Sequence, residues 1–290
     1  MAYIGPAPAN SIIATSDIED GAVTSAKLGG NIVTPGTLDV NGQELILDAN
    51  ANTSLTADTD DQVDIKVGGT DVVTLTNSSF VLKGTTPTLT IGDAGTEDTK
   101  IVFDGNAQDF HIGLDDTADD LVIGLGSALG TTTHMSFDET GAILKPLQPA
   151  FLAQVTSVMS NLALSTQHPV TMDNEIFDQN GDFNTTNYTF TAPVTGRYLL
   201  STALRLDNMD TATTAYACTI LASSREFTCG ILDPDDFASD VTWMVFSGTF
   251  IVDMDASDTA KVQMYVDSGG TPQADIQSGT NATFSGCLLV

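Results

Sequence analysis

The stretch "NYTFTAPVTGRYLLSTALRL", residues 187–206, holds two alternating apolar segments on either side of one corner. The first segment carries Phe190 and stops at Pro193, which cannot donate a hydrogen bond to a neighbouring strand. Gly196 permits a turn into the second segment, which alternates from Tyr198 onward. The pattern predicts two antiparallel strands whose aromatic side chains need a thick core.

Composition favours a β-rich and strongly acidic protein. The chain has 290 residues with 9 Lys and Arg against 38 Asp and Glu, so its formal net charge is -29. Most of the acids are Asp, a turn residue, and the 25 Gly with many Thr, Val and Ile favour strands joined by turns. With 41% hydrophobic residues the chain can form packed cores, which excludes a disordered acidic tail.

The charge and the hydropathy exclude several partners. Because no basic patch is present to neutralise phosphates, we expect no nucleic-acid partner. No run of about 18 apolar residues is present, so we expect no membrane insertion. Residues 1–21 lack a basic region followed by an apolar core and do not resemble a secretory signal.

The three cysteines, Cys218, Cys229 and Cys287, are an odd and sparse set. Such a set argues against a disulfide framework, so we expect reduced and at least partly buried thiols. A Cys218–Cys229 bridge is the alternative.

Three zones differ in composition and predict three domains. Residues 1–33 allow a turn or two of helix and bury little by themselves, so we expect this leader to attach to another protein. Residues 34–149 are short alternating strands separated by acidic or glycine-rich turns. Residues 150–290 are richer in aromatics at the regular turn spacing of a jelly-roll β-sandwich. The predicted fold class is all-β, a fibrous trimeric shaft followed by a jelly-roll head.

The shaft strands have one apolar face each but few large side chains. A monomeric sandwich of this length would carry more core bulk. We therefore expect the apolar faces to be buried against identical chains, three around one axis, with an ordinary monomeric β domain as the alternative.

Alternation predicts the individual strands. In the shaft they include 63–67, 101–103, 110–114, 121–125 and 135–137. In the head they are 151–158, 170–177, 188–191, 197–206, 216–222, 227–232, 241–254, 261–266 and 282–290. His111 alternates with apolar residues, so we expect it on the outer face of its strand.

Four stretches of the third zone resemble the trimeric jelly roll of the complement globular head and tumour-necrosis-factor superfamily. They are "PVTMDNEIFDQNG" (169–181), "YTFTAPVTGRYLLSTAL" (188–204), "FSGTFIVDMDASDTAKVQMYV" (246–266) and "NATFSGCLLV" (281–290). The resemblance implies a homotrimeric head whose C-terminal strand runs back toward the shaft. Residues 207–240 carry little of the family's signal, so the fold is implied more firmly than any family ligand site.

The first two zones resemble bacteriophage tail fibres. The similar stretches are "DIEDGAVTSAKL" (17–28), "LTADTDDQVDIKVGGTDVVTLT" (55–76) and "TKIVFDGNAQDFHIGLDDTADDLVIGL" (99–125). This resemblance implies a fibre that is assembled in the host cytoplasm, becomes part of the virion, and docks to tail or adaptor proteins through residues 1–33. The candidate attachment residues are Ile18, Val23 and Leu28.

Three acidic or amide-rich loops are the candidate receptor site. If the C-terminal strand runs back toward the shaft, loops 207–214, 233–240 and 268–281 lie at the far end of the head. Their carboxylates and amides suit sugar hydroxyls or a basic protein patch, so we predict binding to a host-surface glycan or an outer-membrane protein. The candidate receptor-binding residues are Asp207, Asn208, Asp210, Asp233, Asp235, Asp236, Gln273, Asp275 and Gln277.

Calcium is the one metal that the sequence suggests. Asp233, Asp235, Asp236 and Asp240 share one short loop, and a solvated acidic loop is the alternative. The stretch "DANAN" (48–52) has the first half of an EF-hand loop but lacks the later Gly and Glu. We expect no other cofactor.

No catalytic motif is recognisable. The three His are far apart and lack partners at metal-ligand spacing, and neither a nucleophile elbow nor a nucleotide loop is present. We predict a binding protein rather than an enzyme. The alternatives are a purely structural virion fibre or a non-viral trimeric adhesin whose head serves trimerisation, and last a glycan depolymerase.

Overall fold

A computed structural model describes residues 18–19, 40 and 42–290 of the chain. The chain divides into two compact units, Met1–Thr90 and Ile91–Val290, and each is described by itself. Ile18 is exposed, whereas Val23 and Leu28 lie outside the described residues. In the part of the chain that the structure describes, no helix has the length and apolarity needed to cross a membrane.

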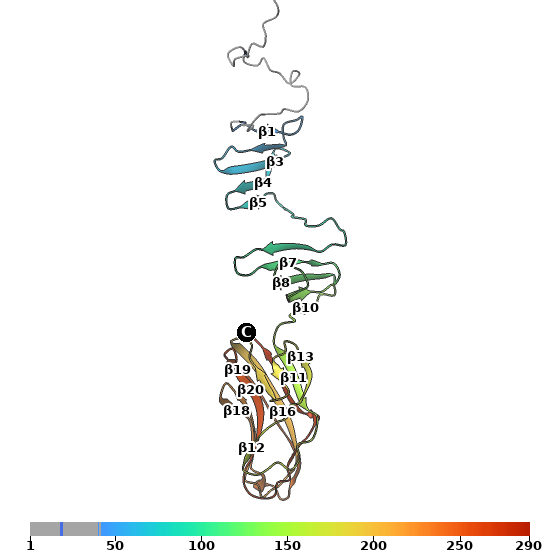
Figure 1. The fold of residues 1–290 in the computed structure, drawn as a ribbon, viewed down its shortest axis with the longest axis vertical. Coiled ribbons are helices and arrows are strands. Elements are labelled where there is room, and N and C mark those ends of the chain that lie inside the picture. Colours follow the sequence, from blue (N-terminus) through green and yellow to red (C-terminus); the bar gives the residue numbers. More distant parts are fainter. Residues whose placement is uncertain (1–17, 20–39, 41) are drawn as a thin grey trace, which may run out of the picture. The chain divides into compact units, whose positions relative to one another are not determined.

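The first unit contains a five-stranded antiparallel sheet in which each strand pairs with the next, here called the first meander (Figure 1). Its strands are β1 (Leu45–Ile46), β2 (Ser54–Thr56), β3 (Gln62–Val67), β4 (Thr70–Thr76) and β5 (Phe80–Leu82). Gly68 and Gly69 join β3 to β4 with φ of 62° and 81°. Two successive positive φ values are what a two-residue hairpin turn of type I′ requires, so this glycine pair fixes the hairpin.

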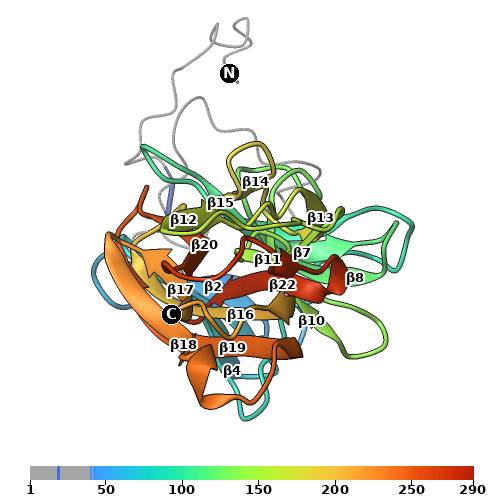
Figure 2. The same cartoon turned by 90° about the horizontal axis from the view of Figure 1, so that it is seen from below.

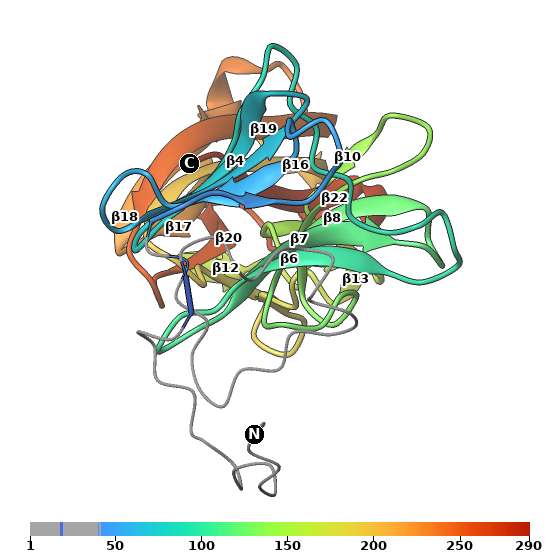
Figure 3. The same ribbon diagram turned by 90° about the horizontal axis from the view of Figure 1, so that it is seen from above.

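The second unit begins with another five-stranded antiparallel sheet, the second meander. Its strands are β6 (Thr99–Phe103), β7 (Phe110–Asp115), β8 (Asp120–Leu125), β9 (Thr133–Phe137) and β10 (Ile143–Leu144). The strands of each meander lie side by side in a single layer (Figures 1 and 3). A single layer cannot bury either of its own faces, so any apolar face of these two sheets is left exposed in one chain.

Each meander carries a continuous apolar ladder on one face. In the first meander the register places apolar residues opposite one another across all five strands; they are Leu45, Leu55, Val63, Ile65, Val73, Leu75, Phe80 and Leu82. The corresponding ladder of the second meander is Ile101, Phe103, Phe110, Ile112, Leu114, Leu121, Ile123, Leu125, Met135, Phe137 and Ile143. Large members stay uncovered, since Phe80 is 58% exposed and Phe103 is 60% exposed.

The opposite face of the second meander includes glycines, and part of it is buried. His111 lies on this face, as the alternation predicts, but the expectation of an outward-facing side chain is wrong because His111 is only 1% exposed. Its ring packs over Gly124, the residue paired with it on β8, where a β-carbon would lie 2.6 Å from the ring. The Nδ1 atom lies 2.8 Å from the Gly126 carbonyl oxygen, so Nδ1 carries the proton.

The head is a sandwich of two antiparallel sheets with jelly-roll strand order. The first head sheet has the order β13-β11-β22-β16-β19, and the second has the order β14-β15-β20-β17-β18. In the first sheet the strands are β11 (Ala150–Val155), β13 (Asn174–Asp178), β16 (Gly196–Met209), β19 (Val241–Met254) and β22 (Gly279–Leu288), with β21 (Asp275–Ile276) pairing with β16. In the second they are β14 (Phe183–Asn184), β15 (Thr189–Thr191), β17 (Tyr216–Ala222), β18 (Arg225–Leu232) and β20 (Thr259–Val266), with β12 (Thr166–Pro169) pairing with β20.

Aromatic side chains fill the space between the two head sheets. The Phe151 ring centroid lies 4.8 Å from that of Phe190 and 5.0 Å from that of Phe284. All three residues are essentially inaccessible to solvent. Because β11 and β22 belong to one sheet and β15 to the other, this cluster joins the sheets into one core.

The corner of residues 187–206 forms as predicted, with one change in the role assigned to glycine. β15 ends at Thr191 and β16 begins at Gly196. A β-carbon at Gly196 would lie 2.6 Å from the Val290 carbonyl oxygen. Gly196 is therefore required because the C-terminal backbone approaches it closely, not for a special turn conformation. The Tyr198 hydroxyl donates to the Val194 carbonyl oxygen at 2.7 Å and closes the corner.

The predicted head strands are confirmed, apart from their ends and three short additions. The three strands that alternation missed are β12, β14 and β21. Tyr188 was predicted in a strand but has φ of 61° and lies just before β15. Its ring still packs against the core, which explains why it looked like a strand residue.

We expect Gly196→Ala to lower the free energy of unfolding of the head by about 1–3 kcal/mol, the usual effect of overpacking. The added methyl group would overlap the backbone of Val290. Denaturant unfolding at a fixed protein concentration measures the change. Arg197→Ala, at the exposed neighbouring position, is the control and should shift the free energy by less than about 0.5 kcal/mol. Equal effects of the two substitutions would contradict the packing argument.

Candidate functional site

The three loops predicted to bind a receptor meet at one end of the sandwich, which Figure 2 views end-on. They are joined by side-chain hydrogen bonds between residues far apart in sequence, and all three loops take part. At the other end the chain enters the head, where the Leu288 amide donates to the Pro149 carbonyl oxygen at 3.0 Å. The loops therefore lie at the end of the sandwich away from Pro149, as predicted from the direction of the C-terminal strand. We call this end the loop end.

Two aspartates hold the loop end together. The Asp210 carboxylate accepts from the amide and hydroxyl of Thr271 at 2.7 and 2.8 Å. The Asp240 carboxylate accepts from the Thr211 amide at 3.0 Å and from the Gln273 side chain at 3.0 Å. These bonds favour the charged carboxylates: the amides of Ala212 and Thr271 lower the pKa of Asp210, and the Thr211 amide followed by Gln273 lowers that of Asp240.

A third aspartate, Asp275, lines a hollow beside these contacts. Its carboxylate accepts from the Asn208 side chain at 3.0 Å and from the Asn161 amide at 2.8 Å. Both asparagines have positive φ, 57° and 55°, a conformation that Asn tolerates better than most residues. The hollow has a volume of about 420 Å³ and is lined by Asn161, Asn208, Asp240, Val241, Thr242, Gln273 and Asp275. It therefore presents carboxylates and amides rather than apolar groups.

Asp207 has a different environment from its neighbours. The Arg205 guanidinium donates to both of its carboxylate oxygens at 2.7 and 2.8 Å. Trp243, which pairs with Asp207 across β16 and β19, is 59% exposed, and the guanidinium carbon lies 5.7 Å from its ring centroid. Asp207 is thus paired with Arg205, and the exposed indole belongs to the residue that follows Thr242, which lines the hollow.

The acidic stretch 233–240 is not arranged around one point. Asp233 precedes the short 3-10 helix η3 (Pro234–Asp236) and accepts from the Asp235 amide at 3.4 Å. The negative charge of Asp233 raises the pKa of Asp235. In residues 18–19, 40 and 42–290, no group of three or more His, Cys, Asp or Glu is placed to hold a metal ion. The calcium hypothesis for Asp233, Asp235, Asp236 and Asp240 stays a prediction that this arrangement does not favour.

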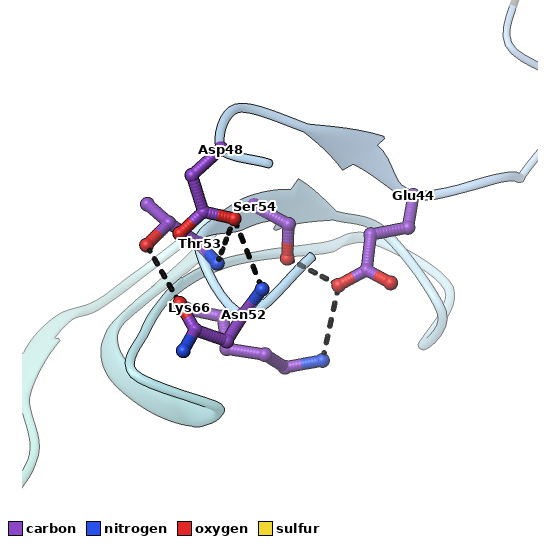
Figure 4. Close-up of polar contacts among 6 residues, drawn as sticks. All are labelled: Glu44, Asp48, Asn52, Thr53, Ser54 and Lys66. Atoms are coloured by element: carbon purple, nitrogen blue, oxygen red, sulfur yellow. Dashed lines mark hydrogen bonds and ion pairs between the residues drawn. The ribbon is translucent and has the colours of Figure 1, made fainter. Parts of the chain in front are cut away.

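The loop "DANAN" likewise uses its oxygens within the chain (Figure 4). The Asp48 carboxylate accepts from the Asn52 and Thr53 amides at 3.0 and 3.3 Å, which closes the turn before β2. Nearby, Glu44 accepts from the Ser54 hydroxyl and from Lys66 at 3.2 Å. These carboxylates stabilise the edge of the first meander.

The structure brings together only part of the predicted receptor site. Asn208, Asp210, Gln273 and Asp275 join the network at the loop end, whereas Asp233, Asp235 and Asp236 take no part in those hydrogen bonds. Gln277 donates its backbone amide to the Arg205 carbonyl oxygen at 3.0 Å. Sequence reasoning missed Asn161, Thr211 and Thr271, and it considered Asp240 only as a metal ligand. No local pattern could reveal Asn161, which lies 114 residues before its partner Asp275.

The outer face of the first head sheet is free of charge over its central part, in a chain with a formal charge of -29. Strand alternation and register place Leu199, Ser201 and Ala203 of β16 beside Ser247, Thr249 and Ile251 of β19 and beside Thr283, Ser285 and Cys287 of β22. Charged residues return at the ends, with Arg205 and Asp207 at one and Arg197 and Asp253 at the other. Because the chain is acidic elsewhere, this uncharged face is a candidate contact surface.

The comparisons with known proteins add fold likenesses only. No family model matches the chain, and no curated protein matches it. Among solved structures, the globular domain of zebrafish complement 1qA protein is 19% identical with a TM-score of 0.37, covering 49% of this chain and 98% of that one. Murine APRIL is 10% identical with a TM-score of 0.35, covering 49% and 99%. The jelly-roll architecture itself follows from the strand order of the two head sheets.

We expect acidification to loosen the loop end before it unfolds the sandwich. The folded-state pKa values of Asp210 and Asp240 are lowered, so their contribution to stability is complete above the unfolded value of about 3.9 and is lost as the pH falls through the lower folded values. Fluorescence of Trp243, the single tryptophan, should change in that window while far-ultraviolet circular dichroism stays constant. Asp210→Asn with Asp240→Asn should remove this transition. Fluorescence and dichroism changing together would contradict a local event.

Proposed function

We propose that this protein is a homotrimeric bacteriophage tail fibre that contacts the host cell through the loop end of its C-terminal head. Residues 1–33 attach it to tail or adaptor proteins of the virion, and the head meets a host-surface glycan or an outer-membrane protein. The observation that carries the proposal is the pair of uncovered apolar ladders in the two meanders.

The ladders support obligate association of identical chains. Burying a Leu, Ile or Phe side chain contributes about 1.5–3 kcal/mol, and each ladder exposes several of them in a single chain. A partner that is always present when the chain folds is another copy of the chain. Three single-layer sheets arranged around one axis bury all three ladders and leave the opposite faces in solvent.

The head supports the same symmetry. The charge-free part of the outer face of the first head sheet carries exposed Ile251 on the edge strand β19, and exposed Val245 lies just beyond it, beside Arg205. Three heads that meet through this sheet bring together faces without like-charge repulsion, while acidic residues elsewhere stay in solvent. Trimerisation also presents each loop end three times, which raises the avidity for a repetitive cell surface.

The sequence resemblances in the leader and the shaft support the phage part of the proposal. Residues 17–28, 55–76 and 99–125 are similar to phage fibre sequences, and the loop end lies at the end of the head away from the chain entry at Pro149. Loops at the free end of a rigid scaffold are where recognition residues commonly lie.

Ile101→Asp should disrupt the trimer, because it places a charge within the apolar ladder of the second meander, on the edge strand β6. Light scattering coupled to size-exclusion chromatography should give three times the chain mass for the unmodified protein and a lower mass, or aggregation, for the variant. Lys100→Asp is the matched control, since the adjacent residue points to the opposite face and is exposed. A trimer that survives Ile101→Asp, or a parent protein of another stoichiometry, would overturn the trimeric arrangement.

Asn208→Ala with Asp275→Ala should slow adsorption of virions to their host by at least about tenfold, the effect of losing about 1.4 kcal/mol per site. The change removes groups from the hollow and leaves the charge-free face intact. Adsorption is measured as the loss of free infectious particles from the supernatant of host cells. Glu226→Ala, an exposed acid on β18, is the control. Unchanged adsorption of intact virions with the double variant would instead favour a purely structural head.

A further inference from the structure

Two of the three cysteines lie side by side in the head. Cys218 belongs to β17 and is fully buried, and Cys229 belongs to the adjacent strand β18 and is partly buried. Each thiol shifts the pKa of the other, and all three cysteines are free thiols. Cys287 lies in the first head sheet, on β22.

A bulge in the β17–β18 ladder turns Cys229 toward Cys218. Cys218 pairs with Gly230 and Thr219 pairs with Thr228, so Cys229 is the extra residue between two regular pairs. In a regular ladder, successive residues point to opposite faces, and Cys229 would face away from Gly230. The bulge lets Cys229 also face the core, opposite Cys218. Neighbouring strands lie about 4.8 Å apart, which fits the separation that a disulfide needs between its two Cα atoms.

Two glycines leave room around Cys229 and the neighbouring Phe246 ring. A β-carbon at Gly248 of β19 would lie 2.9 Å from the Cys229 sulfur, and one at Gly230 would lie 3.0 Å from the Phe246 ring. Ser223 and Ser224, with φ of 50° and 60°, form the tight turn that joins β17 to β18. The two thiols therefore sit toward the open end of one hairpin, where a covalent bond would hold its strands together.

The two thiols differ in access and in acidity. Cys229 is the partly exposed one, and its contact with Cys218 lowers its pKa. The same contact, together with burial, raises the pKa of Cys218. A thiolate is the form that attacks a disulfide, so Cys229 is suited to react first with a reagent from solution and Cys218 to react second.

We propose that Cys229 and Cys218 form a thiol–disulfide exchange site that accepts a low-molecular-weight disulfide and closes into a reversible bond between β17 and β18. The Cys229 thiolate attacks one sulfur of the reagent, forms a mixed disulfide and releases one thiolate. Cys218 then loses its proton to solvent and attacks the Cys229 sulfur, which releases the second thiolate. The protein loses two protons and two electrons in total, and the reagent disulfide gains both and is reduced to two thiols.

The bond would fix the edge of the second head sheet after the protein leaves a reducing compartment. β18 is the edge strand of that sheet, and the bulge interrupts its ladder to β17. A disulfide here would close a short loop and so reduce the conformational freedom of the unfolded chain. In the folded protein it would hold the edge strand β18 against β17. The inference rests on the two thiols and stands independently of the phage function.

The test uses the full-length protein, reduced and then incubated with oxidised glutathione at millimolar concentration. We expect intact mass to fall by two hydrogen atoms, a peptide map to join the segments that hold Cys218 and Cys229, and the thermal midpoint to rise by about 5 °C. Dithiothreitol should reverse all three changes. Retention of all three thiols, a bond that includes Cys287, or a stable glutathione adduct on the unmodified protein would overturn the proposal.

Serine variants of single cysteines test which thiol attacks first. Cys218→Ser should stop at a glutathione adduct on Cys229, whereas Cys229→Ser should leave Cys218 unmodified because it is buried. Cys287→Ser should behave as the parent protein. Rapid modification of Cys218 in the Cys229→Ser variant would overturn the assigned roles. If a serine variant fails to fold, the mass and peptide map of the parent protein still decide whether the bond forms.

Discussion

An apolar sheet face must be covered, and this chain covers only some of its own. In the head, two sheets face each other and aromatic residues such as Phe151, Phe190 and Phe284 fill the space between them. In each meander a single sheet carries a ladder of comparable apolarity with nothing from the described part of the chain over it. The difference lies in the number of layers, because the strands of all four sheets alternate in the same way. The proposed association of chains would cover the apolar faces of these single-layer regions.

The acidic composition complements this constraint. A formal charge of -29 opposes any contact between copies unless the contacting faces are free of carboxylates. The ladders of both meanders contain no charged residue, and the central outer face of the first head sheet contains none either. Like-charge repulsion therefore disfavours contact between copies over most of the surface, and the proposed contacts use the faces that carry no charge.

Sequence predicted the strands well because alternation is a local property, but it could not predict contacts that depend on distant residues. The role of Gly196 depends on Val290, and the position of Asn161 depends on Asp275. The burial of His111 depends on Gly124, a cross-strand neighbour that leaves space for the ring. Likewise, the bulge at Cys229 is a shift in register, and nothing in the local pattern of β18 marks it. Loop positions were predictable from strand order, whereas the partners of each loop carboxylate were not.

The acidic loops contain two kinds of aspartate with different uses. Asp210, Asp240 and Asp275 accept several hydrogen bonds each, so they determine the shape of the loop end. The negative charge of Asp233, by contrast, raises the pKa of Asp235. A ligand that donated to the carboxylates of the first group would have to replace hydrogen bonds that already exist within the protein, so it would gain little from them. The hollow therefore offers a ligand a preorganised shape and the unused lone pairs and amide protons, while the stretch 233–236 offers negative charge that the fold has not used.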